Sequence, residues 1–337
     1  MTDLTEYAEL HGCSCKVGQA DLESLLREAN IDTHGTTHDE LIFGIGEDAA
    51  ARRLTDELAL VQTIDFFTPV IDDPYDFGQV AACNAMSDAF ATGATENLSC
   101  LAVLGIPREL TEKAAAILAG MADALAEVGG TLVGGHTILN PWPLAGGAIT
   151  ATAHPDELLS MAGATPGDHL FVTKPLGTQP AMGALRVQDG EFAAMVTDAT
   201  TRPIAEVGRE ALAWMTTPNL DAALLAREFA TAATDVTGFG LLGQSRTLAD
   251  RAGVGIELTR IPVIPGTPEL SELFGYGLAS GESAETSGGL LLSVPDARRA
   301  AFVERAEQEG IFCSPVGRVV SGTGVTIEKA VVESVQE

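Results

Sequence analysis

Two apolar runs early in the chain carry acidic residues near their carboxyl ends: LIFGIGEDAA at 41–50 and LALVQTIDFF at 58–67. Apolar runs of this length between polar segments are typical of buried β-strands. Asp48 and Asp65 are these acids, and side chains at the ends of neighbouring strands can point into a shared cleft. The pattern therefore favours a sheet-containing fold with carboxylates gathered at one site.

Helix-like segments lie between further strand-like segments. The segment 77–93 is predicted to be a helix with Asp76 as its N-cap, and on it Asn84 and Asp88 are four residues apart and share one face. An Ala-rich helix is expected at 111–128. Because strands and helices are mixed without strict β–α–β alternation, the sequence favours an α+β fold over a doubly wound sheet. Further strands are expected at 97–106 and 145–154. A short strand that runs into a glycine-rich turn is expected at 131–137, and a strand followed by a turn at 168–177.

The chain is long enough for two domains. It has 337 residues, of which 46% are hydrophobic and only 5% aromatic, so the cores must be built mainly from Ala, Val, Leu and Ile. We expect a mobile N-terminal segment at 1–40, an N-terminal domain at 41–157 and a C-terminal domain at 158–337. Glycines beside apolar runs recur in both halves, which is a loose likeness and not a measurable repeat.

The chain is strongly acidic, with 47 acidic against 19 basic residues and a formal net charge of −28. Such a charge repels nucleic acids and anionic membranes, so neither is an expected partner. An acidic surface poor in lysine also suits a salt-rich cytoplasm, where screening weakens the repulsion among carboxylates.

The sequence indicates a cytoplasmic protein. Its start lacks the basic and apolar regions of a signal peptide, and no apolar run is long enough to span a bilayer. The five cysteines are odd in number and scattered along the chain. That distribution does not match a disulfide framework and fits a reducing compartment.

Four aspartates are candidates for a metal site: Asp48, Asp65, Asp88 and Asp235. Mg²⁺ prefers oxygen ligands and is commonly held by one or two carboxylates together with substrate phosphates. Since the chain has 47 acidic residues, any single one is more readily explained as a solvated surface residue or a turn cap. The expectation therefore depends on the sequence context of these four.

Three glycine-rich segments accompany the acids, at 134–137, 235–240 and 286–289. Glycine allows backbone N–H groups to approach phosphate oxygens, and a helix that begins near Gly238 would attract anions. None of the three matches the phosphate-binding loop or the dinucleotide pattern, so ordinary turns are the alternative explanation.

The cluster HGCSCK at 11–16 is more distinctive. A lysine near a thiol lowers the pKa of the thiol, and a thiolate suits a soft chalcogen or a soft metal. A structural zinc site is not expected because no second cysteine pair matches, and Lys16 can meet a phosphate as a point charge. A mobile tail with incidental thiols is the alternative. Lys174 is more readily interpreted as a surface residue at a strand end than as a phosphate ligand.

In order and approximate spacing, the motifs resemble those of one family, selenophosphate synthetase, within the superfamily of aminoimidazole-ribonucleotide synthetase-like ATP enzymes. The segments that carry the resemblance are HGCSCK, GEDAA, QTIDFFTPVIDDPYDFG, NAMSDAFATGA, VGGHT, TKPLG, TDVTGFGLLG and TSGGLLL. TDVTGFGLLG by itself is also found in other members of the superfamily. The Cys-Lys cluster together with DFFTP and NAMSD narrows the resemblance to the selenophosphate synthetase family.

The resemblance implies that ATP, selenide and water are converted to selenophosphate, AMP and orthophosphate. It also implies a homodimer formed through ATP-binding N-terminal domains, whose mixed sheets pair into a barrel. Breaking two phosphate bonds requires heavy charge neutralisation, so more than one Mg²⁺ is expected. By position, the resemblance assigns catalysis to Cys13 and Lys16 and metal binding to Asp48, Asp88 and Asp235. It assigns ATP binding to Lys16, Ile45, Gly46, Glu47, Asp65 and Asp88. It also implies that Gly135, His136 and Thr137 contact the ATP of the partner subunit.

The sequence departs from the family pattern in three places. The spacing from His-Gly to Cys is shorter than usual, Ser14 stands where Gly is frequent, and Ser283-Ala284-Glu285 replaces the usual Asp-Pro-Gln. The last departure leaves open how the second-domain loop packs. Two other functions remain as alternatives. One is a thiamine-monophosphate kinase-like or aminoimidazole-ribonucleotide synthetase-like enzyme, which would produce ADP; the other is a non-catalytic paralogue that binds ATP or a chalcogen.

Overall fold

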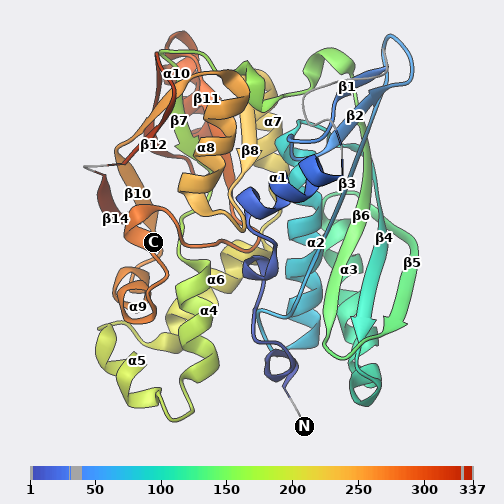
Figure 1. The fold of residues 1–337 in the computed structure, drawn as a ribbon, viewed down its shortest axis with the longest axis vertical. Helices are drawn as coiled ribbons and strands as arrows, with labels where there is room; N and C mark the ends of the chain where they lie inside the picture. The colour runs from blue at the N-terminus through green and yellow to red at the C-terminus, as the bar shows by residue number, and fades with distance from the viewer. Residues whose placement is uncertain (1–2, 30, 32–39, 328–329, 336–337) are drawn as a thin grey trace.

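The computed structural model describes residues 3–29, 31, 40–327 and 330–335, and it shows two α+β domains side by side (Figure 1). The α+β class expected from the sequence is confirmed. The boundaries placed at 41 and 158 stay predictions, and parts of the segment expected at 1–40 lie outside the described residues. No helix in the described ranges has both the length and the apolar character needed to cross a membrane.

The first domain is built on a mixed sheet, six-stranded within the described residues. All neighbouring strands in it run antiparallel except β4 and β5, which are parallel. In order across the sheet, its strands are β1 (Leu41–Phe43), β2 (Ala50–Arg53), β3 (Ala59–Phe67), β6 (Leu144–Ala153), β4 (Glu96–Ile106) and β5 (Thr131–Leu139).

Two of the expected strand ends differ in the structure. The run at 41–50 leaves β1 after Phe43, so Asp48 lies in the loop that joins β1 to β2. The run at 58–67 continues as β3 beyond Asp65, whose side chain is buried beneath the sheet instead of ending the strand. Alternation along β3 explains this placement, because Asp65 has the same parity as the buried Phe67.

The second domain also contains a sheet that is six-stranded within the described residues, flanked by a parallel two-stranded pair. In order, the sheet consists of β13 (Gly324–Thr326), β9 (Gly255–Leu258), β12 (Ser314–Val320), β7 (His169–Val172), β11 (Leu290–Val294) and β8 (Ala232–Asp235), and the pair is β10 (Arg260–Val263) with β14 (Val331–Ser334). Helices α7 (Leu220–Phe229), α8 (Gly240–Ala252) and α10 (Asp296–Glu309), with the short η5 (Met161–Gly163), contact this sheet. The other helices in this half of the chain are η4 (Pro155–Glu157), α4 (Thr178–Val187), α5 (Ala193–Ala199), α6 (Ile204–Thr216), α9 (Thr267–Phe274) and η6 (Leu278–Ser280).

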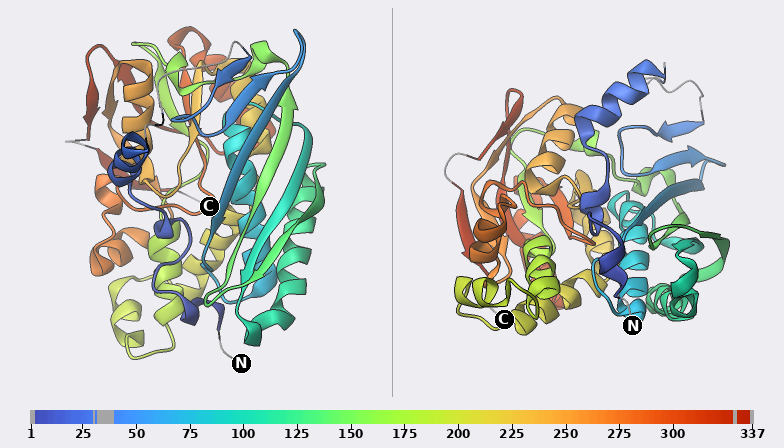
Figure 2. Two further views of the ribbon diagram at one scale, coloured as in Figure 1. Left: turned by 45° about the vertical axis from the view of Figure 1, so that its right-hand side comes forward. Right: turned by 60° about the horizontal axis from the view of Figure 1, so that its bottom comes forward.

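Helices α2 (Pro74–Ala91) and α3 (Ala114–Glu127), the latter preceded by η3 (Arg108–Lys113), cover one face of the first sheet (Figure 2). Glycines bring the two backbones into contact, which suits a core poor in aromatic residues. A Cβ atom at Gly78 would lie 2.0 Å from the carbonyl oxygen of Ile117, and one at Gly120 would lie 2.0 Å from that of Tyr75. Any larger residue at either position would push the helices apart.

Helix α2 lies at the centre of the molecule. Besides α3 and the first sheet, it contacts α6 and β8 of the second domain, and side chains all around it are buried. A helix that is apolar on every side is expected in such a place. Its N-cap is Asp73, which accepts hydrogen bonds from the backbone N–H groups of Tyr75 and Asp76, so the prediction of Asp76 as the cap is wrong.

The N-terminal elements η1 (Leu4–Tyr7), η2 (Cys13–Cys15) and α1 (Gln19–Glu28) run along the junction of the two domains (Figure 1). The chain before η2 is tied to the first domain: the Gly12 N–H donates to the Thr68 carbonyl oxygen at 3.0 Å, and Thr5 donates to Asp72 through its N–H and its hydroxyl. These ties bring the 11–16 cluster to the site described next.

Candidate active site

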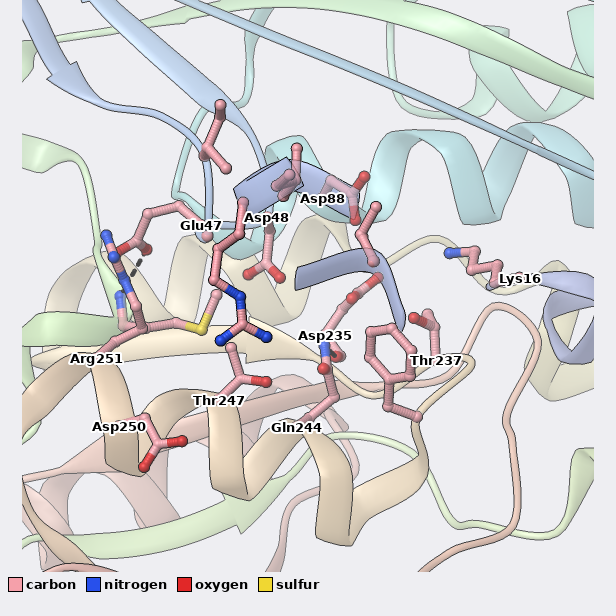
Figure 3. A pocket seen from close by; sticks show the side chains of 17 residues that line it. Lys16, Glu47, Asp48, Asp88, Asp235, Thr237, Gln244, Thr247, Asp250 and Arg251 are labelled. Atoms are coloured by element: carbon pink, nitrogen blue, oxygen red, sulfur yellow. Dashed lines mark hydrogen bonds and ion pairs between the residues drawn. The ribbon is translucent and has the colours of Figure 1, made fainter. Parts of the chain in front are cut away.

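Three aspartates from separate elements converge where the two domains meet (Figure 3). Asp48 lies in the loop between β1 and β2, Asp88 lies near the end of α2, and Asp235 ends β8. One carboxylate oxygen from each lies within 4.8 Å of the other two. The fold therefore gathers into one cluster three of the four acids singled out from the sequence.

Two of these carboxylates are oriented by threonine hydroxyls. Thr63 donates to Asp88 at 2.6 Å, and Thr234 donates to Asp48 at 2.9 Å. The third, Asp235, has a buried Oδ2 atom without a hydrogen-bond partner among the described residues. A buried carboxylate oxygen with no partner is costly, and a cation bound there would satisfy it.

Burial raises the pKa values of Asp48, Asp88 and Asp235, and repulsion from Asp235 adds to the effect at the other two. Carboxylates held together in this way disfavour one another's ionised forms unless a positive charge lies between them. A set of oxygen donors with excess negative charge is what a hard divalent cation such as Mg²⁺ prefers. The residues present therefore fit a divalent-cation site.

A chain of hydrogen bonds links the N-terminal cluster to the fourth acid. Lys16 Nζ lies 2.6 Å from Asp65 Oδ2, and Asn84 Nδ2 donates to the same oxygen at 2.7 Å. Cys13 Sγ in turn donates to Asn84 Oδ1 at 3.2 Å. Burial opposes the charge on Lys16, but the nearby carboxylates of Asp65 and Asp88, together with the hydrogen bond to Asp65, outweigh it and raise the pKa of the lysine. Lys16 is therefore a fixed positive charge beside the aspartate cluster.

The Cys13 thiol does not have the lowered pKa expected from its sequence neighbour. Its side chain is almost completely buried, at 1% exposed, and burial raises the pKa of the thiol far above its usual value. Lys16 acts in the expected direction, yet its effect is smaller than the cost of burying a thiolate. The structure thus holds Cys13 as a protonated thiol that donates to Asn84.

A cavity of about 640 Å³ lies against the cluster. Of the residues predicted from the sequence, Lys16, Ile45, Gly46, Glu47, Asp48, Asp88 and Asp235 line it. Several of its other lining residues were not among the candidates predicted from the sequence, including Arg27, Gln244, Thr247 and Arg251. The last three lie on α8, directly after the glycine-rich segment 235–240 that contributes Thr237 and Phe239, so the motif marked the right segment although it did not identify these side chains.

Glu47 has a partner in the second domain and is not free to bind a ligand through its carboxylate. It accepts hydrogen bonds from the Ser160 hydroxyl and the Met161 N–H, both at 2.9 Å, and pairs with Arg251 at 3.2 Å. These contacts fasten the loop that carries Ile45, Gly46 and Asp48 to η5 and α8. Asp48 is thereby held in register with Asp235.

Gly135, His136 and Thr137 do not reach this cavity. They lie on β5, an edge strand whose residues are nearly all exposed, and the glycine pair continues the strand where the sequence predicted a turn. Pairing with β4 explains the difference, since Gly135 packs directly on the backbone of Ala102. Their predicted role toward a partner subunit's ATP stays a prediction.

The departure at Ser283-Ala284-Glu285 forms a buried cap on α4. The Glu285 carboxylate accepts hydrogen bonds from the N–H groups of Gly177 and Thr178 and from the Thr178 hydroxyl, at 2.8, 2.8 and 2.5 Å. The Thr178 hydroxyl oxygen in turn accepts a hydrogen bond from the Thr286 N–H, so the loop before the TSGG segment is anchored to the helix. Such a cap offers an anion to the unpaired N–H groups at the helix start.

Lys174 is buried, so its interpretation as a surface lysine is wrong. Its Nζ donates to the carbonyl oxygens of Thr217 and Ser287 at 2.6 and 2.9 Å, and burial lowers its pKa to about 8. The Ser287 N–H donates to Asn84 Oδ1 at 2.9 Å. Lys174 therefore helps to position the amide that orients Cys13 and Asp65.

We expect Glu285→Gln to change how stability depends on pH. Burial raises the pKa of Glu285 from 4.5 to about 7, so between these values the folded state binds the proton that the unfolded state has lost. The free energy of unfolding should therefore fall as pH rises through this window, by up to about 3 kcal/mol from this group. Urea unfolding at pH 5 and pH 8 should show the wild type losing stability relative to Glu285→Gln. Parallel curves for the two proteins would contradict the assignment.

Two family models together match most of the chain. The model for the AIR synthase related protein, N-terminal domain, matches residues 46–153, and the model for its C-terminal domain matches residues 165–329.

Curated relatives match over most of their length. "Selenide, water dikinase" of Methanococcus maripaludis is 42% identical, with 95% of this chain and 96% of the relative covered. The protein of the same name from Methanocaldococcus jannaschii is 41% identical, with 94% and 92% covered. "Selenide, water dikinase 3" of Danio rerio is 34% identical, with 89% and 74% covered.

Solved structures share the fold at lower identity. AaThiL complexed with AMPPCP and TMP matches with a TM-score of 0.71 at 21% identity, covering 93% of this chain and 94% of that one. E. coli HypE, a hydrogenase maturation protein, matches with a TM-score of 0.63 at 20% identity, covering 92% and 93%. At such identity the likeness establishes the architecture alone.

Proposed function

The chain belongs to the selenide, water dikinase family of the AIR synthase-related proteins, and we propose that its clustered aspartates hold divalent cations against the triphosphate of ATP. It is an enzyme that makes selenophosphate from ATP, selenide and water, with AMP and orthophosphate as the other products. What is proposed is how the residues of this chain carry out that reaction.

The proposal rests mainly on the convergence of Asp48, Asp88 and Asp235 at the wall of one cavity, with a carboxylate oxygen of Asp235 left without a partner. A volume of about 640 Å³ is within the range of pockets that hold small molecules of nucleotide size. Magnesium ions bound by these carboxylates would neutralise phosphate charge and stabilise the charge that develops as the phosphate bonds break.

Lys16 and Cys13 are assigned to the reacting end of the substrate. Lys16 is a positive charge held by Asp65, and it would stabilise the oxygens of the transferred phosphoryl group. Cys13 lies on the same hydrogen-bond chain through Asn84, which places the thiol where it would position selenide. Asn84 and Lys174 act through these residues and not on the substrate.

Two other functions fit the structure less well. A thiamine-monophosphate kinase-like or aminoimidazole-ribonucleotide synthetase-like enzyme would not need a cysteine and a lysine hydrogen-bonded near the metal-binding aspartates. The solved structures of AaThiL and of the Aquifex aeolicus thiamine monophosphate kinase are only 21% and 19% identical to this chain. A non-catalytic paralogue would have no reason to keep Cys13, Lys16 and Asp65 in one hydrogen-bond chain.

One assay separates these functions. The protein is incubated with ATP and Mg²⁺, with and without selenide under anaerobic conditions, and the phosphorus species are followed by NMR. Selenide-dependent AMP together with a selenium-bonded phosphate is the expected result. ADP would instead indicate a sibling enzyme, and no turnover would indicate a binding protein.

We also propose that the chain forms a homodimer through the open face of the first sheet. This face presents apolar side chains to solvent, including Ile64, Phe66, Leu101 and Val133, which are 59%, 45%, 48% and 58% exposed. An apolar patch of this kind on a sheet favours pairing with a second copy. Such pairing into a barrel would present β5, with Gly135, His136 and Thr137, to the partner subunit.

Ile64→Glu is expected to convert the dimer to a monomer. Removing an isoleucine that the proposed dimer buries, and placing a charge in the interface, should weaken association by at least about 100-fold. Sedimentation velocity over a range of concentrations measures the shift. Val331→Glu, the same kind of change at a residue 60% exposed on β14, is the matched control and should leave the assembly unchanged. An Ile64→Glu protein that sediments as wild type would contradict the proposed interface.

A reducing cytoplasm stays the predicted location. All five cysteines are free thiols, and three of them, Cys13, Cys83 and Cys100, are buried. Chemistry that positions a selenide anion also requires reducing conditions. The assignment of more than one Mg²⁺ is part of the same proposal.

A further inference from the structure

A second cavity, of about 160 Å³, lies beside the N-terminal cluster and shares no lining residue with the first. The 11–16 turn contributes to both cavities, with Lys16 in the wall of the first and His11 and Ser14 in the wall of the second. The smaller volume is below the range of pockets that hold nucleotides. It has room for a small ion together with a few water molecules.

This second cavity contains hydrogen-bond donors that have no protein acceptor. In the part of the chain that the structure describes, the Arg186 guanidinium makes no hydrogen bond or ion pair, and the Tyr276 hydroxyl makes no hydrogen bond. Both residues are half-buried and line the cavity. Burial lowers the pKa of Arg186, but a guanidinium remains charged in a protein. A half-buried cation without a partner is costly, and an anion in the cavity would remove that cost.

The charges around the cavity favour a singly charged anion. His11 does not add a positive charge, because its Nε2 lies 2.9 Å from the Thr5 carbonyl oxygen and burial lowers the pKa of its ring. Glu9 lines the cavity, and Asp72, whose Oδ1 is held by Thr5, acts on Arg186 from nearby. Glu9 is exposed, so solvent screens its charge, and the Arg186 guanidinium is a cation in the cavity wall. A singly charged anion can pair with that guanidinium, whereas a phosphate carries more negative charge than one guanidinium balances.

The cavity reaches the immediate neighbours of Cys13. Ser14 and Thr286 form part of its wall, and the Thr286 hydroxyl accepts a hydrogen bond from the Cys13 N–H at 3.1 Å. The approach is close because residue 12 is glycine: a Cβ atom on Gly12 would lie 2.3 Å from the Thr286 hydroxyl oxygen. By contrast, the first cavity is lined by three clustered carboxylates, which repel a free anion and which we assign, together with the divalent cations they would hold, to the nucleotide.

We propose that this second cavity binds the chalcogenide substrate, a small, soft, singly charged anion, before it meets Cys13. The inference rests on the proposed function, under which the anion is hydroselenide. Arg186 supplies the charge and Tyr276 a hydrogen bond, while Met182 and Val70 form an apolar wall suited to a weakly hydrated anion. Selenide and ATP therefore enter through separate cavities on the two sides of the 11–16 turn.

Arg186→Met tests the assignment through steady-state kinetics. A hydrogen bond to a charged group contributes enough that KM for selenide should rise at least about tenfold. KM for ATP should stay within about twofold of wild type. Arg186→Lys keeps the charge and should recover most of the loss. Arg209→Met makes the same change at an exposed residue on α6 and should leave both constants as in wild type. An unchanged KM for selenide, or an equal rise in both constants, would overturn the proposal.

A second measurement does not depend on turnover. Crystals of the wild-type protein soaked in sodium iodide, a soft monoanion, should show an anomalous peak in the second cavity within about 4 Å of the Arg186 guanidinium. No peak there, or an adventitious ion only, seen equally at exposed arginines, would overturn the proposal. A wild-type protein that binds iodide in this cavity but makes no selenophosphate would overturn the proposed function and support the anion site.

Discussion

Asp235→Asn should lower turnover by at least about 1000-fold while the protein remains folded. The substitution keeps the shape of the side chain and removes the charge from a carboxylate whose buried Oδ2 has no hydrogen-bond partner in the part of the chain that the structure describes. We expect that oxygen to bind a cation that neutralises the phosphates of ATP. Removing the charge of Asp235 then removes stabilisation of the transition state of phosphoryl transfer. The measurement is kcat for selenide-dependent AMP formation, together with the midpoint of thermal unfolding.

Stability should respond in the opposite direction to activity. Burial and the neighbouring Asp65 raise the pKa of Asp235, and Asp235 itself raises the pKa values of Asp48 and Asp88. Removing one charge relieves this repulsion, so the unfolding midpoint without added metal should stay the same or rise. Asp221→Asn, on the exposed side of α7, is the matched control and should change neither quantity. A large loss of stability with little loss of kcat would mean that Asp235 is a structural residue.

Lys16→Met is expected to be similarly severe, with kcat lowered at least about 1000-fold. The lysine is the cation that lies between Asp65 and the cavity, and methionine keeps its length without its charge. The variant should also lose about 1–2 kcal/mol of stability, because Asp65 is left buried without its partner; the partial exposure of Lys16 reduces the cost below that of a fully buried pair.

The double variant Lys16→Met with Asp65→Asn separates the two effects. Removing both charges should restore most of the stability, whereas activity should remain as low as in the single variant. Lys113→Met, in η3 and outside the cavity, is the matched control for the loss of a lysine. Recovery of activity in the double variant would show that Lys16 serves only to neutralise Asp65, which would contradict its assignment to the phosphoryl group.

The aspartates of the metal cluster could be predicted from the sequence because they lie in recognisable motifs. Asp88 shares a helix face with Asn84, and Asp235 opens a glycine-rich motif, so both could be chosen from 47 acidic residues. The α+β class followed from the mixture of strand and helix patterns. The meeting of these acids across the domain boundary was implied by the family resemblance and not by the local patterns, because that contact joins distant parts of the chain through α2.

The errors at Cys13 and Lys174 share a physical cause, which is burial by distant segments. Cys13 and Lys174 looked like exposed groups beside polar neighbours, yet tertiary packing encloses both and moves their pKa values away from what their local sequence indicates. Glu285 looked like a departure from a pattern and proves to cap α4 through three hydrogen bonds. No sequence pattern predicted a functional role for Arg186, because only the fold brings it close to the turn at 11–16.

The central claim is that aspartates from both domains hold the cation that neutralises ATP. The direct test is a crystal structure with Mn²⁺ and a non-hydrolysable ATP analogue, recorded at the manganese absorption edge. We predict an anomalous peak about 2.0–2.3 Å from carboxylate oxygens of Asp235 and at least one of Asp48 and Asp88, with phosphate oxygens completing the shell. A nucleotide bound with its manganese held by water and phosphates alone, away from all three side chains, would contradict the account.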